Sequence, residues 1–137
     1  MGDKLAPSVV LDTNVLVSAI FRTGNNPCRI MELALGRKVN LYYSSEMMTE
    51  YKLVLYRSKF NFSHEVLARL FDGIAENGHL IAPAPSTFAM PDESDRIFYD
   101  TAKASGSYLI TGNTKHYPTE PFVVTPAEFI DLLAPTI

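Results

Sequence analysis

The sequence is poor in cysteine and has no long apolar run. Cys28 is the single cysteine among 137 residues, so no internal disulfide can form, and we expect a cytoplasmic protein. No stretch approaches the roughly 18 consecutive apolar residues of a membrane helix. The chain reaches Asp12 too early for a secretory signal. We therefore expect neither a membrane-spanning nor a secreted protein.

Positive charge is also scarce, because 12 lysines and arginines stand against 15 aspartates and glutamates. The net charge of -3 argues against a general nucleic-acid-binding protein, since such proteins are usually basic. A catalytic site built from carboxylates also makes the net charge negative. The negative charge alone therefore does not exclude a protein that acts on nucleic acid. Repeats, low-complexity runs and linkers are missing as well, and residues 1–137 suit one domain with one core.

Short apolar stretches alternate with segments that carry helix signals. Strands are expected at residues 9–11, 40–44, 79–82, 108–110 and 122–124, and helices at residues 14–21, 26–35, 45–57, 64–77, 92–105 and 126–133. Asn26 is the expected N-cap of the second helix, with Pro27 in the first turn, and the stretch "TPAE" is a capping box. This alternation predicts an α/β protein, a three-layer α/β/α sandwich around a mainly parallel sheet of about five strands.

The first strand runs directly into a carboxylate, in the stretch "SVVLDTNVL". In open parallel sheets, ligands bind outside the carboxyl ends of the strands, which is where Asp12 would lie. The alternative is that Asp12 caps the helix that follows it, as aspartate often does. Taken alone, this residue leaves both interpretations open.

Two further acids project toward the inside of their helices at about 100° per residue. Glu50 falls within the apolar arc of the helix at 45–57, and Asp95 falls near the middle of the buried side of the helix at 92–105. Asp100 projects to the opposite, solvent-exposed side. A carboxylate on an inward face is costly unless a charged group meets it, and for Glu50 an arginine is the simple alternative.

A polar turn follows the fourth strand, again at a carboxyl end. Thr111, Gly112 and Asn113 form a turn by composition, and an ordinary turn is the alternative here. Several carboxylates that share a cleft with this turn would need a cation to stay ionised. Oxygen ligands favour Mg²⁺ or Mn²⁺, and such sites usually act on phosphate esters.

Four stretches in this order, "VVLDTNVL", "EYKLVLYRSKF", "DESDRIFYDTA" and "YLITGN", resemble the PIN domain over residues 9–133. The resemblance implies a metal-dependent ribonuclease of the kind found among bacterial toxin–antitoxin toxins, VapC-like, that cleaves single-stranded RNA. Water activated by Mg²⁺ or Mn²⁺ would attack the phosphorus in line and leave a 5′-phosphate and a 3′-hydroxyl. A cognate antitoxin and a homodimer are the partners that such a toxin implies.

The resemblance also implies roles for individual residues. Asp12, Glu50 and Asp95 stand at the acidic positions of the metal site and are the expected catalytic residues. Asn14 would orient the first carboxylate, and Thr111 occupies the threonine or serine position of the family's T-G-D turn.

The sequence departs from the family in the same turn. Asn113 stands where many members have a fourth aspartate, so the site loses one negative charge, and a second metal ion has less support. Asp92 is a candidate to supply that charge from across the cleft. Lys115 and His116 follow directly and are the expected contacts for substrate phosphates at the rim.

Two other functions remain open. A PIN domain with a weakened site could act as an RNA-binding or protein-interaction module, and Asn113 favours this alternative. A phosphatase of the haloacid-dehalogenase type also has an aspartate after its first strand. That family needs a second aspartate where Asn14 stands, and a lysine before a late acidic pair, which the sequence lacks.

Overall fold

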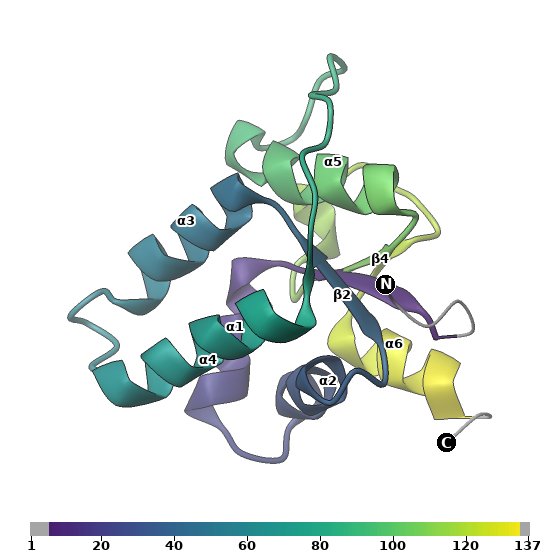
Figure 1. Ribbon diagram of the computed structural model, residues 1–137. Coiled ribbons are helices and arrows are strands. Elements are labelled where there is room, and N and C mark those ends of the chain that lie inside the picture. The colour runs from purple at the N-terminus through teal and green to yellow at the C-terminus, as the bar shows by residue number, and fades with distance from the viewer. Residues whose placement is uncertain (1–5, 135–137) are drawn as a thin grey trace.

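The computed structural model describes residues 6–134, and a five-stranded parallel sheet forms its centre (Figure 1). Its strands lie in the order β3-β2-β1-β4-β5, and their bounds are β1 Ser8–Leu11, β2 Asn40–Tyr43, β3 His79–Leu80, β4 Tyr108–Ile110 and β5 Val123–Val124. All four strand pairs are parallel. The predicted α/β class and five-stranded parallel sheet are therefore confirmed.

Six α-helices in the described chain cover the sheet. Their bounds are α1 Thr13–Phe21, α2 Asn26–Leu35, α3 Ser45–Leu55, α4 His64–Asn77, α5 Arg96–Ser105 and α6 Pro126–Leu133. Helix α5 packs on β1, β2 and β4 from one face, and α2 and α6 pack together on the other (Figure 1). None of the helices in residues 6–134 combines the length and the apolar character needed to cross a lipid bilayer.

The helix starts follow from local side-chain chemistry. Ser44 accepts a hydrogen bond from the backbone nitrogen of Met47 at 3.2 Å, and Thr125 forms the predicted capping box at the start of α6. The predicted N-cap of α2 is wrong by one residue. Asn25, not Asn26, caps this helix, because its Oδ1 reaches the Cys28 nitrogen at 2.8 Å.

The segment at residues 92–105 differs from the continuous helix that the sequence predicts. A 3₁₀ turn at Glu93–Asp95 comes first, and α5 begins only at Arg96. The side chain of Asp95 therefore follows 3₁₀ rather than α-helical geometry. The inward placement of Asp95 is right, but it does not arise from the assumed helical period.

The solvent-exposed position predicted for Asp100 is wrong. Asp100 is only 8% exposed, and its Oδ2 accepts a hydrogen bond from the Ser86 nitrogen at 3.1 Å. The loop before α5 folds over this face, and Arg96 fastens it by donating to Ser86 Oγ at 2.7 Å and to the Phe88 carbonyl at 2.6 Å. A helical projection takes no account of a loop that returns to cover the helix.

The sheet contains a topological switch point between β1 and β4. The chain passes from β1 to β2 and β3 on one side, and then crosses to β4 and β5 on the other. In open α/β sheets, such a point leaves a crevice at the carboxyl ends of the two strands. Here those ends are Leu11 and Ile110, which are register partners.

Candidate functional site

Asp12 lies directly after β1 at this switch point. Its backbone nitrogen donates to the Ile110 carbonyl at 3.0 Å, so Asp12 and Thr111 follow the sheet side by side. Asp12 is the residue before α1, yet its side chain makes no capping hydrogen bond. Its Oδ2 instead accepts hydrogen bonds from Thr111 Oγ1 at 2.9 Å and from Tyr117 Oη at 2.8 Å. The capping alternative therefore fails, because the carboxylate is held toward the crevice by two hydroxyl groups.

Asn14 stabilises the turn that carries Thr111. Its Oδ1 accepts from the Gly112 nitrogen at 3.0 Å, and its Nδ2 donates to Thr111 Oγ1 at 3.4 Å. Thr111 Oγ1 also accepts from the Asn113 nitrogen at 3.1 Å. This arrangement links Asn14 to Asp12 through Thr111, so Asn14 acts on the carboxylate indirectly.

Tyr117 is a site residue that the sequence does not reveal. It is almost fully buried, and burial raises its pKa far above the usual range, with the charges of Asp12 and Asp95 adding to the effect. The phenol therefore stays protonated and donates to Asp12. Tyr117 follows a 3₁₀ turn at Thr114–His116, where no strand or helix period marks a residue as inward-facing.

Glu50 extends from α3 toward the start of α1. Its Oε2 accepts a hydrogen bond from Thr13 Oγ1 at 2.7 Å, and Thr13 is the neighbour of Asp12 in the chain. Within residues 6–134, Glu50 forms no ion pair with an arginine or lysine, so the simple alternative for this residue is not observed. Burial raises the pKa of Tyr51, and the charges of Asp12 and Glu50 raise it further, which places both carboxylates near that phenol.

Asp95 carries the most unusual carboxylate of the site. Its side chain is 14% exposed, and its buried Oδ2 has no hydrogen-bond partner among the described residues. His116 Nδ1 lies 3.5 Å from this oxygen. Burial raises the pKa of Asp95 to about 6, the charges of Asp12, Asp92 and Glu50 raise it as well, and His116 opposes them. Four carboxylates therefore act electrostatically on the same small region.

The remaining predicted residues surround this region. Asn113 Nδ2 lies 2.9 Å from His116 Nε2, so the imidazole connects the Asn113 turn with Asp95. Asp92 is exposed, and its Oδ1 accepts from the nitrogen and the hydroxyl of Ser94, which lower its pKa. Lys115 is exposed and makes no ion pair within the described chain.

The donor chemistry of the site fits a hard cation, although a complete ligand set is not assembled. A cation would satisfy the Asp95 oxygen that has no hydrogen bond within the described chain, and both hydrogen bonds to Asp12 reach Oδ2 rather than Oδ1. In the part of the chain that the structure describes, no group of three or more His, Cys, Asp or Glu could hold a metal ion as placed. The convergence of Asp12, Glu50 and Asp95 on one ion therefore stays a prediction.

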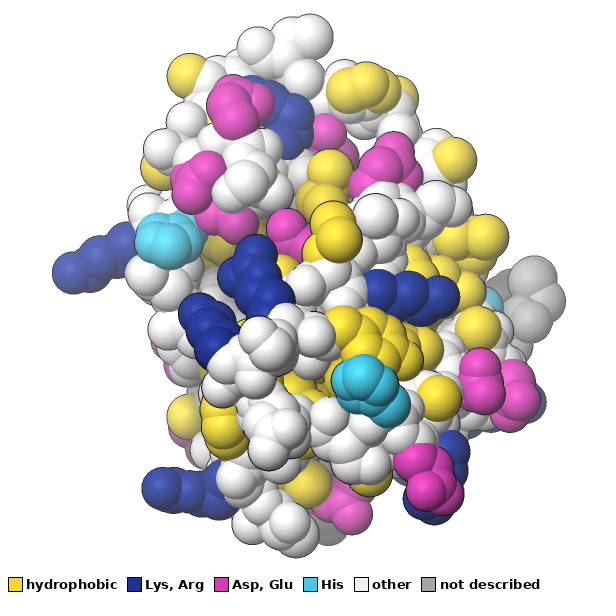
Figure 2. Space-filling model, turned by 90° about the vertical axis from the view of Figure 1, so that its left-hand side faces the viewer, with side chains coloured by type: hydrophobic (Ala, Val, Ile, Leu, Met, Phe, Trp, Pro, Cys, Tyr) yellow, Lys and Arg dark blue, Asp and Glu magenta, His cyan; other side chains and the backbone are white. Residues whose placement is uncertain are grey.

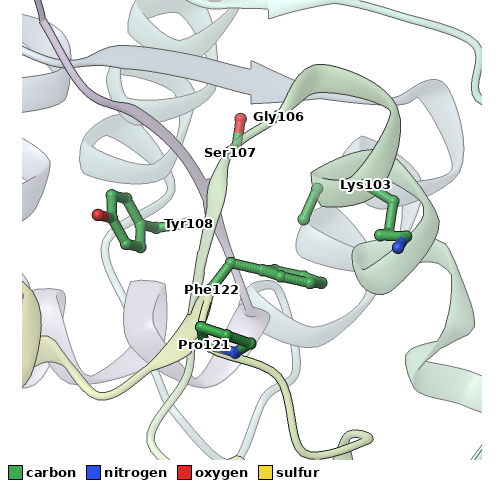
Figure 3. Close-up of a pocket in the computed structure, with 7 residues that line it drawn as sticks. Lys103, Gly106, Ser107, Tyr108, Pro121 and Phe122 are labelled. Atoms are coloured by element: carbon green, nitrogen blue, oxygen red, sulfur yellow. The ribbon is translucent and has the colours of Figure 1, made fainter.

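A hollow of about 470 Å³ lies elsewhere, at the amino ends of β4 and β5. Figure 3 shows Lys103, Ser107, Tyr108 and Phe122 among the side chains around it. Its lining contains no carboxylate. It is therefore separate from the candidate site, which lies at the carboxyl ends of the strands.

Two sequence comparisons show which known proteins this chain resembles. The PIN domain family model matches residues 8–115. The protein MJ1680 of Methanocaldococcus jannaschii is 25% identical over 114 residues, which cover 81% of this chain and 74% of that protein.

Two solved structures share the fold. PAE2754 from Pyrobaculum aerophilum superposes with a TM-score of 0.63 at 13% identity, covering 99% of this chain and 94% of that one. VapBC2 from Rickettsia felis, bound to a DNA fragment from its promoter, gives a TM-score of 0.53 at 17% identity, covering 86% and 96%. At such identities the two structures support the fold alone. Because the family model matches well over half of the sequence, the chain belongs to the PIN domain family.

Proposed function

We propose that this PIN-domain protein is a Mg²⁺- or Mn²⁺-dependent endoribonuclease that hydrolyses single-stranded RNA. The observation that carries the proposal is the buried Oδ2 of Asp95, which has no hydrogen-bond partner among the described residues and whose carboxyl pKa is raised by burial and by the carboxylates around it. A buried carboxylate oxygen without a hydrogen bond costs stability, and a bound dication would remove that cost. Perturbed carboxylates in such a crevice are typical of functional sites.

The residues of the chain have separate roles in this proposal. Asp12 and Asp95 would hold the ion, and Glu50 would complete its acidic surroundings. Thr111 and Tyr117 fix Asp12 so that its second oxygen stays free for the ion, and Asn14 acts through Thr111. Such an ion supplies Lewis-acid chemistry, since it polarises the phosphate and lowers the pKa of water.

The substrate contacts lie at the rim. Lys115 and His116 meet the phosphates on either side of the bond that breaks, and Asn113 positions His116. The oxygen of water attacks phosphorus, the bond to the 3′-oxygen breaks, and that oxygen takes a proton. The products are a 5′-phosphate and a 3′-hydroxyl.

The biological setting is part of the same proposal. The Rickettsia felis neighbour is a VapBC2 assembly on promoter DNA, and we infer that this chain is likewise a toxin with a cognate antitoxin. A cytoplasmic location suits a chain with one cysteine, and a homodimer is the proposed assembly. An antitoxin gene beside the gene for this chain, and co-purification of the two products, test the pairing.

A metal-dependent cleavage assay tests the enzymatic part. The protein is incubated with a mixed-sequence single-stranded RNA in Mn²⁺, in Mg²⁺ and in EDTA, together with the variants Asp12→Asn and Asp72→Asn. We expect cleavage with either metal, none in EDTA, and a loss of roughly 100-fold or more in Asp12→Asn. Asp72 is exposed on α4, so Asp72→Asn is the matched control and should cleave like the wild type.

One observation favours a second function. Asn113 removes a charge from the site, and the described residues do not assemble three metal-ligating side chains. A protein that binds single-stranded RNA but neither binds Mn²⁺ nor cleaves in any of these conditions is an RNA-binding or protein-interaction module instead.

A further inference from the structure

Two stretches of this acidic chain contain no acid. Residues 13–31 include Arg22 and Arg29, and residues 51–64 include Lys52, Arg57 and Lys59, but neither stretch contains an aspartate or glutamate. All five cations have exposed side chains, and none forms an ion pair with another residue in 6–134. Unpaired surface cations in an acidic protein leave a local positive field that attracts an anion.

Three phenylalanines lie between these cations and form what we name the aromatic platform, namely Phe21, Phe60 and Phe62. The rings of Phe60 and Phe62 stack in parallel, with centroids 5.2 Å apart and an interplanar angle of 7°. Phe21 meets both rings edge-on, at 5.7 Å and 5.0 Å, and remains 62% exposed. A large aromatic side chain left this exposed is costly in water and is typical of a binding surface.

The turn that builds the platform contains one left-handed residue. Asn61, between the two stacked rings, adopts a positive φ of 50°, a conformation that asparagine tolerates better than most residues other than glycine. Lys59 places its Nζ 5.1 Å from the centroid of Phe60. The turn therefore holds a cation and two parallel, half-buried rings together beside the exposed Phe21.

The platform is joined to the carboxylates by two helices. Helix α1 begins beside Asp12 and ends at Phe21, a length of about 13 Å. Helix α3 carries Glu50, and Arg57 follows its end. Figure 2 shows a face of the molecule on which Lys and Arg side chains lie between acidic side chains and hydrophobic ones. A strand that crosses the site can continue onto the platform.

We propose that the platform and its cations, Arg22, Arg57 and Lys59, bind single-stranded RNA a few nucleotides from the bond that is cut. This inference rests on the proposed function and adds the path of the substrate to it. A base stacks on the exposed face of Phe21, and the cations contact the phosphates on both sides of that base. Stacking on aromatic rings beside unpaired cations suits single strands of any sequence, since every base has a flat face.

Binding in EDTA separates this inference from catalysis. Affinity for a fluorescent single-stranded RNA of mixed sequence is measured by anisotropy for the wild type, Phe21→Leu and Lys59→Ala. The leucine retains apolar surface but removes the ring, and Phe21 is exposed enough for the fold to tolerate the change. Phe122→Leu, at the hollow on the opposite edge of the sheet, and Lys38→Ala, an exposed lysine outside both acid-free stretches, are the matched controls.

We expect about tenfold weaker binding for Phe21→Leu and no change for Phe122→Leu. Lys59→Ala should weaken binding and lower the dependence of log Kd on log salt by about 0.7, while Lys38→Ala should leave it unchanged. Loss of binding in both platform variants without any cleavage by the wild type supports the platform and rejects the nuclease.

Two results overturn the inference. Cleavage by the wild type with unchanged KM and Kd in both platform variants rejects the platform and leaves the nuclease intact. A dimer in the wild type that Phe21→Leu converts to a monomer, with RNA affinity unaffected, assigns this face to a second copy of the chain.

Discussion

Asp95 and Asp100 lie close together in the sequence, yet their surroundings differ. The region around Asp100 stabilises its carboxylate with a hydrogen bond, and the region around Asp95 leaves a buried carboxylate oxygen without one. Asp100 is the more buried of the two, and the Ser86 nitrogen donates a hydrogen bond to it under the loop. Asp95 is less buried, but its Oδ2 has no hydrogen-bond partner among the described residues, and the charges of other acids raise its pKa. The comparison teaches that exposure alone does not identify a functional acid. What distinguishes Asp95 is that its burial is not compensated by a hydrogen bond.

The largest expected difference between Asp95 and Asp100 is in the rate of RNA cleavage. Asp95→Asn should reduce the rate by roughly 100-fold or more, because it removes charge from the proposed ion site. Asp100→Asn should leave the rate per folded molecule within about threefold. Both rates are measured on single-stranded RNA in saturating Mn²⁺. Equal losses in the two variants would show that the distinction between the acids is mistaken.

Asp100→Ala provides the structural counterpart of that test. It removes the acceptor for the partly buried Ser86 nitrogen, and we expect a loss of about 1–3 kcal/mol in the free energy of unfolding. Asp100→Asn keeps an acceptor oxygen and should lose less. Urea denaturation measures both values, and an unchanged midpoint in Asp100→Ala contradicts the structural role.

A smaller expected effect is the dependence of the protein's stability on pH, which follows from the raised pKa of Asp95. The pKa of Asp95 is about 6 in the folded protein, above its ordinary value of 3.8, so the native state holds this proton more tightly than the unfolded chain does. Stability in EDTA should therefore fall as pH rises from about 4 to about 6, and stay level above that range. Asp95→Asn should remove this fall and be more stable above pH 6 by about 1 kcal/mol, a modest value because solvent screens the carboxylate.

The melting temperature of both proteins, measured in EDTA across this pH range, checks that expectation. Added Mn²⁺ should raise the melting temperature of the wild type more than that of Asp95→Asn, since only the wild type presents both aspartates. A variant that is less stable than the wild type above pH 6 means that Asp95 has a structural partner.

The smallest expected effect concerns the turn after β4. Asn113→Asp restores the charge that the PIN resemblance leads one to expect, and should tighten Mn²⁺ binding by a few fold, because a carboxylate neutralises a dication better than an amide does. Calorimetric titration with Mn²⁺ measures the change. Asn113→Ser, which removes the amide without adding charge, is the control. An unchanged affinity in Asn113→Asp places this turn outside the metal site.

Much of the architecture follows from local patterns. The short apolar strands, the serine caps of α3 and α4 and the capping box of α6 were predictable, because each depends on residues within a few positions of one another. The position of Asp12 was predictable too, since a strand that ends in a carboxylate places it at the functional edge of a parallel sheet. The short strands β3 and β5 were predicted longer than they are, because sequence patterns define element ends poorly.

Other features required the folded chain. The sequence by itself determined the strand and helix order, and the presence of acids at Asp12, Glu50 and Asp95. Only the tertiary structure decided that the loop over α5 buries Asp100, that Tyr117 returns to hold Asp12, and that no hydrogen bond reaches the buried oxygen of Asp95 within the described chain. The physical reason is distance along the chain. A cap or a strand period acts between near neighbours, whereas Tyr117, the partner of Asp12, comes from a distant segment that only the assembled sheet brings beside it.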